Sequence, residues 1–106
     1  MNRIKSHRIF IEVLTEADET LFKAIIKSVS DERIDFISEI CKNILAGVIL
    51  LKPADKASLA PHADIIRSVA SKKFKTRTRR QLMVRYFTLI KGLLKSSFRR
   101  VFKPDK

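Results

Sequence analysis

The sequence has little glycine, proline and cysteine. Two glycines and three prolines among 106 residues are too few for the many turns of a β-sheet protein, so a helical fold with short connections is expected. The single cysteine, Cys41, excludes an internal disulfide and the usual Cys/His zinc patterns. Because Gly47 and Gly92 are the only glycines, the chain cannot form a glycine-rich phosphate loop.

Long apolar runs and catalytic groupings are also missing. The longest apolar stretch, residues 48–51, is far shorter than the roughly 20 residues that a membrane-spanning helix needs. No secretory signal is visible, so we expect a protein that is intracellular or carried inside a particle, in a reducing setting. His7 and His62 lie far apart and lack carboxylates at metal-ligand spacing. We therefore expect no enzyme activity, no metal site and no cofactor.

Positive charge is abundant, and it is concentrated in one part of the chain. The formal net charge is +12. Residues 1–66 contain 9 Lys and Arg against 10 Asp and Glu, whereas residues 67–106 contain 14 Lys and Arg against one acid, Asp105. A near-neutral part is thus followed by a strongly basic part, and this asymmetry indicates a polyanionic partner.

The spacing of apolar residues predicts a single all-α domain over residues 1–106. We expect a compact bundle of four to five short helices that ends in a cationic amphipathic helix. A short first helix covers residues 8–14, and residues 15–18 then offer capping groups for a second helix. Ser30 is the expected N-cap of a third helix, which is the most buried and ends at Gly47. The apolar face assigned to this third helix extends to Leu45 and Val48.

The two remaining helices are expected after residue 52. Pro53 suits the first position of a fourth helix, and Pro61 should kink this helix near residues 57–61 or divide it in two. Thr78 is a candidate N-cap for a last helix that runs to about Phe102. Its broad apolar face is expected to pack on the bundle.

The basic part contains the candidate binding site. Residues 72–80 include six cations and no acid, and Arg67 and Arg85 flank them. Such residues can neutralise phosphates and release condensed counterions without reading the bases. We therefore predict nucleic-acid binding without sequence specificity by the following residues: Arg67, Lys72, Lys73, Lys75, Arg77, Arg79, Arg80 and Arg85. The aromatic residues are spaced like core residues rather than stacking platforms.

Two other classes of function stay open at this point. The last helix is cationic and amphipathic, as in proteins that lie on anionic membranes. Alternatively, the acidic first half could make the chain a helical adaptor that binds another protein. Self-association as a homo-oligomer is compatible with each of these functions.

The middle of the chain resembles a family of small basic proteins. The resemblance rests on residues 37–47 (ISEICKNILAG), on Leu51-Lys52-Pro53, and on the later stretch 71–83 (SKKFKTRTRRQLM), and it covers about residues 34–83. The family is encoded by adintoviruses, the Polinton-type DNA viruses of animals, and by related elements in invertebrate genomes. This sequence lacks the family's Q-K-G-G-F-L segment after the basic block and has a less basic fourth helix with Pro61 in it.

The resemblance implies a setting for the predicted binding. The family is thought to supply a virion-core component similar to the small condensing peptides of adenovirus cores. By this resemblance DNA is favoured over RNA, and the partner would be packaged viral DNA. The protein would then act in DNA condensation in the virion and the host nucleus.

Overall fold

Over residues 2–102 the secondary structure is entirely helical, and the helices pack around one central helix. The computed structural model describes residues 2–102, with side chains for residues 7–98 and 100–102. It contains seven α-helices and one 3₁₀ turn: α1 (Asn2–Glu16), α2 (Glu19–Ser28), α3 (Asp31–Leu45), α4 (Pro53–Leu59), η1 (Ala60–His62), α5 (Ala63–Ala70), α6 (Thr76–Arg85) and α7 (Phe87–Val101). The predicted all-α bundle is confirmed, although it is divided into more helices than the four to five expected.

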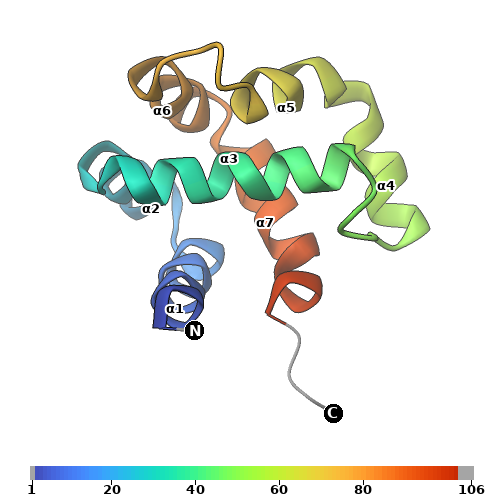
Figure 1. Ribbon diagram of the computed structural model, residues 1–106, viewed down its shortest axis with the longest axis horizontal. Coiled ribbons are helices and arrows are strands. Elements are labelled where there is room, and N and C mark those ends of the chain that lie inside the picture. The colour runs from blue at the N-terminus through green and yellow to red at the C-terminus, as the bar shows by residue number, and fades with distance from the viewer. Residues whose placement is uncertain (1, 103–106) are drawn as a thin grey trace.

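Helix α3 crosses the middle of the molecule and packs against α5, α6 and α7 (Figure 1). Helices α5 and α6 lie on one side of it, and α1 and α7 lie on the other. Helix α2 also packs against α6, and α1 packs against α7. The radius of gyration is 12.8 Å, close to the value of about 13 Å for a compact chain of this size.

Local sequence signals determine several helix ends. The Asp18 side chain accepts a hydrogen bond from the backbone N–H of Leu21 (2.8 Å) and caps α2, and Ser30 caps α3 in the same way through Arg33 (3.4 Å). Gly47 has φ +79°, a left-handed conformation that glycine adopts without a Cβ clash, and it follows the end of α3 as predicted.

The two prolines of the fourth predicted helix have the expected effects. Pro53 is at the first position of α4. Pro61 lies in the 3₁₀ turn Ala60–His62, which divides the segment into the short helices α4 and α5.

The last predicted helix is instead two helices, α6 and α7, separated at Tyr86. Tyr86 has φ −105° and ψ 44°, which lies outside the helical region. The turn lets α6 pack against α2 and α5 while α7 packs against α1 and α3. The predicted N-cap, Thr78, is wrong, because α6 already begins at Thr76 after Lys75.

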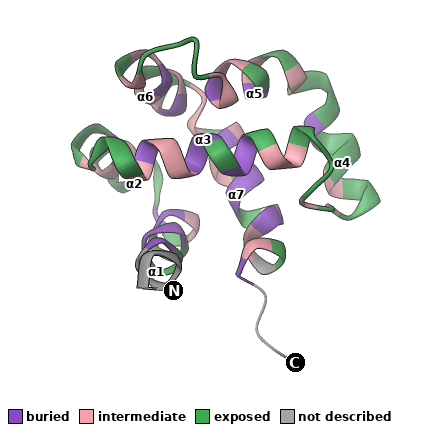
Figure 2. Ribbon diagram, viewed as in Figure 1, coloured by how far each residue is buried: buried purple, intermediate pink, exposed green. Residues whose placement is uncertain are grey.

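The hydrophobic core joins all seven α-helices (Figure 2). Its fully buried members include Phe22 from α2, Ile37 from α3 and Leu93 from α7, each with no exposed surface. The prediction for the far end of α3 is wrong: Leu45 is 39% exposed, and Val48 lies beyond the helix and is 70% exposed. Helix α3 ends before its apolar pattern does, because the chain turns at Gly47.

The apolar face of α7 is packed inside this core. Ile90, Leu93 and Leu94 are all fully buried, and the ring of Phe87 meets that of Phe22 edge-on at 5.1 Å. This arrangement confirms that the last helix docks on the bundle, and it withdraws the apolar face from contact with a bilayer. Within residues 2–102, none of the helices is long and apolar enough to cross a membrane.

Candidate nucleic-acid interface

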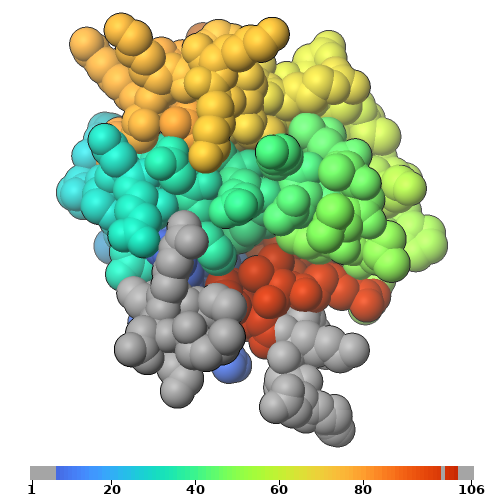
Figure 3. Space-filling view, viewed as in Figure 1, coloured from blue at the N-terminus to red at the C-terminus, as the bar shows by residue number. Residues whose placement is uncertain are grey.

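The predicted binding residues begin at the end of α5 and continue through the next loop along α6. This segment forms one edge of the molecule, seen at the top of the space-filling view in orange (Figure 3). Three of its cations, Lys72, Lys73 and Lys75, lie in the loop and are exposed, and Arg77 is exposed on the first turn of α6. We call these four residues the basic cluster.

Arg79 is not part of this exposed surface, because its side chain is buried. It is only 4% exposed. Its guanidinium donates to Ser38 Oγ at 2.8 Å and lies 2.9 Å from a carboxylate oxygen of Asp35, both on α3. It also donates to the backbone carbonyl of Phe74 (3.1 Å) and to Thr76 Oγ1 (3.2 Å). The prediction that Arg79 contacts phosphate is therefore corrected. Arg79 attaches α6 and the loop before it, residues 71–75, to the central helix, and we call this loop the basic loop.

Arg80 also has a structural role. One of its terminal nitrogens donates to the carbonyls of Ile26 and Val29, at 2.7 Å each. The other lies 2.8 Å from a carboxylate oxygen of Asp31. These carbonyls belong to the end of α2, where helix carbonyls lack intrahelical partners. Arg80 thus caps α2 and links it to α6, which removes it from the predicted contact set as well.

Arg67 on α5 and Arg85 at the end of α6 are also exposed. The Arg67 guanidinium is paired with Asp64 on the same helix at 2.6 Å, so part of its charge is compensated. Arg85 lies at the end of α6 with its guanidinium 5.5 Å from the centre of the Tyr86 ring. By contrast, no ion pair among the described residues involves a member of the basic cluster.

The basic loop is held in a defined shape. The hydroxyl of Ser71 accepts a hydrogen bond from the N–H of Lys73 (3.2 Å), and the Ser71 carbonyl accepts one from the N–H of Phe74 (3.3 Å). The Phe74 carbonyl is then bound by Arg79. Lys72, Lys73 and Lys75 are therefore presented from a turn that is fixed at both ends rather than from a free tail.

Other kinds of chemistry find little support in the described part of the chain. Residues 2–102 contain no group of three or more His, Cys, Asp or Glu side chains that could hold a metal ion. Cys41 is fully buried, and burial raises the pKa of its thiol to about 12, which keeps it protonated. His7 is also buried and stacks on Phe36, with 4.1 Å between ring centroids.

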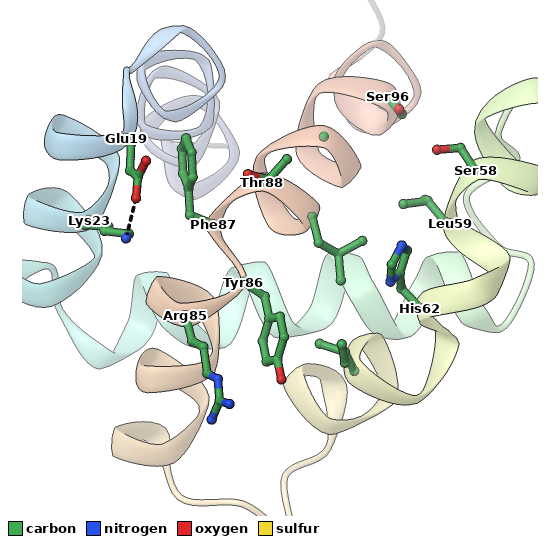
Figure 4. A pocket seen from close by; sticks show the side chains of 13 residues that line it. Glu19, Lys23, Ser58, Leu59, His62, Arg85, Tyr86, Phe87, Thr88 and Ser96 are labelled. Atoms are coloured by element: carbon green, nitrogen blue, oxygen red, sulfur yellow. Dashed lines mark hydrogen bonds and ion pairs between the residues drawn. The ribbon is translucent and has the colours of Figure 1, made fainter.

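A groove that the sequence did not predict lies at the end of α6 away from the basic cluster. It is bounded by α2, by the segment from Ser58 to Ile65, and by the junction of α6 and α7 (Figure 4). Arg85 and Tyr86 contribute to its wall. The sequence gives one signal for this groove: Tyr86 carries a polar hydroxyl among residues that otherwise follow an apolar core pattern.

Comparison with known proteins does not place the chain in a family: no family model, no curated protein and no solved structure matches it.

Proposed function

We propose that the protein binds nucleic acid through the phosphate backbone, using the basic cluster. The observation that supports this proposal is the set of four exposed cations, Lys72, Lys73, Lys75 and Arg77, which lack acidic partners among the described residues. Like charges held close together repel each other, and a polyanion relieves this repulsion. The fixed turn around Ser71 and Phe74 lowers the entropy lost when the cations are ordered on a ligand.

The mechanism is charge neutralisation with counterion release. Each phosphate that a lysine or arginine neutralises releases part of the condensed counterion layer, so binding weakens as salt is added. Four contacts give a slope of log K against log salt of about −3.6 for a duplex, which corresponds to a loss of about 10²-fold between 50 and 200 mM salt. Such contacts follow the backbone and do not distinguish base sequences.

The biological setting proposed for this binding is the packaging and condensation of DNA in a virion core. Only the resemblance of residues 34–83 to the adintovirus proteins supports this setting. Condensation also requires one protein assembly to bind two duplex segments at once. A homo-oligomer with a basic cluster on each copy would do this.

The test compares two variants that remove the same charge from different surfaces. In the first variant, the four residues of the basic cluster are replaced by glutamine. In the matched control, four exposed lysines elsewhere are replaced by glutamine: Lys27, Lys42, Lys52 and Lys56. Affinity for a fluorescent duplex is measured by anisotropy at several salt concentrations.

We expect the cluster variant to lose most of its affinity and most of its salt dependence, and the control to lose much less. If both variants lose the same affinity, binding follows net charge, and the assignment to this surface is wrong. If neither loses affinity, the proposed function itself is wrong.

A further inference from the structure

The groove at the junction of α6 and α7 has a volume of about 640 Å³, within the range of sites that hold small organic ligands. Its apolar lining comes from Leu59, Ile65 and Leu89, together with the aromatic rings of Tyr86 and Phe87. The polar groups around it include the hydroxyls of Ser58, Thr88 and Ser96 and the imidazole of His62 (Figure 4).

A polar stripe connects the groove to the basic cluster. Arg77, Gln81 and Arg85 are spaced four residues apart on α6, so they share one face of the helix, and all three are exposed. The stripe is about 12 Å long, given the helical rise of 1.5 Å per residue. Arg77 belongs to the basic cluster, and Arg85 lines the groove. A chain of phosphates can therefore follow α6 from the loop to the groove.

We propose that the groove accepts an unpaired base of a single-stranded nucleic acid whose phosphates lie on the basic cluster and along the α6 stripe. This inference rests on the function proposed above, and it adds a preference for unpaired strands. Bases in a duplex are stacked and paired, so they cannot enter a groove without being flipped out. Bases of a single strand are free to stack on aromatic side chains, whatever their sequence.

The charges around the groove favour this occupant. Arg85 provides a cation at the end nearest the basic cluster, where a phosphate would precede the bound base. On the opposite wall, Lys23 and Glu19 form an ion pair at 2.6 Å, so their charges cancel. The groove thus combines one cation without an acidic partner among the described residues, apolar and aromatic side chains on which a base can stack, and polar groups that can bind the edges of the base.

Tyr86 makes the inference directly measurable. It is the only tyrosine, and the chain contains no tryptophan, so the intrinsic fluorescence of the protein reports this position alone. A base stacked on the ring should quench the emission. The probes are single-stranded oligothymidylate, oligouridylate and a DNA duplex of equal length, each added to saturation as judged by anisotropy. Free N-acetyltyrosinamide corrects for light absorbed by the nucleic acid.

Two variants separate groove binding from phosphate binding. Gly92 lines the groove, and a Cβ added there meets no atom within 4 Å, so Gly92→Leu should place a bulky side chain in the groove while preserving the fold. Tyr86→Leu removes the stacking surface. We expect each variant to bind the single strands about tenfold more weakly, the typical cost of removing one stacked base, while duplex affinity stays unchanged. Circular dichroism checks that both variants are folded.

The inference predicts strong quenching by both single strands and little by the duplex, with quenching lost in Gly92→Leu. Salt-sensitive binding without quenching, or single-strand affinity unchanged in Gly92→Leu, would overturn the groove assignment and leave the proposed function intact. Absence of salt-sensitive binding to every probe would overturn the proposed function itself.

Discussion

Arg77 and Arg79 lie two residues apart on α6, but the side chain of Arg77 is exposed and that of Arg79 is buried. We predict that Arg79→Ala lowers the free energy of unfolding by about 3 kcal/mol. The variant leaves the buried hydroxyl of Ser38 without its 2.8 Å partner and deprives the Phe74 carbonyl of its donor. Asp35 contributes less to the loss, because its side chain is 42% exposed and water can solvate it.

The measurement is urea unfolding followed by circular dichroism, with Arg77→Ala as the matched control. The control removes the same side chain from an exposed position, so it should change the unfolding free energy by less than about 0.5 kcal/mol. It should instead reduce the salt slope of nucleic-acid binding by about 0.9, the contribution of one phosphate contact. Equal stabilities of the two variants would refute the buried role assigned to Arg79.

Three further predictions concern the fold. Gly47→Ala should destabilise the protein by about 1 kcal/mol, because alanine is strained at φ +79°. Gly92→Ala should stabilise it by up to about 1 kcal/mol, because Gly92 lies inside α7 with open space around it. Thermal unfolding measures both changes. Leu94→Ala should cost about 3 kcal/mol in urea unfolding if α7 docks in the core, and a change below about 1 kcal/mol would contradict docking. Burial raises the pKa of the Cys41 thiol from 9.0 to about 12, so the folded state holds this proton more tightly than the unfolded chain. The resulting stability is fully present below about pH 9, and the free energy of unfolding should fall as the pH rises to about 12. Urea unfolding of Cys41→Ala should show a smaller fall over the same range.

The features that the sequence predicted correctly depend on local chemistry. The caps at Asp18 and Ser30, the start of α4 at Pro53 and the turn at Gly47 each depend on residues within one helical turn. The all-α fold follows from helical periodicity together with the shortage of turn residues. Such signals act over a few residues, so they can be read without knowing which helices meet.

The break at Tyr86 could not be predicted in this way. The apolar pattern continues from Met83 to Ile90 without a proline or a glycine to interrupt it. The break separates α6, which packs against α5, from α7, which packs against α1 and α4. Only the tertiary arrangement shows that, and the groove beside Tyr86 depends on it.

Arg79 and Arg80 were assigned to the binding surface because they belong to a run of cations. Part of the correction was available in the sequence, since Arg79 lies four residues before the buried Met83 and so shares its face of α6. The partners of the two arginines could not be read from the sequence. The partners of these arginines, Asp35 and Asp31, lie on α3 far away in the chain, and the sequence does not show that the two helices are neighbours.

The dependence of duplex affinity on salt tests the central claim most directly. The four cations of the basic cluster give a slope of log K against log salt of about −3.6, and participation of Arg67 and Arg85 would bring it to about −5.4. The account predicts a slope between these values, with little difference between duplexes of different sequence. A slope near zero, or one unchanged when the basic cluster is replaced by glutamine, would contradict it.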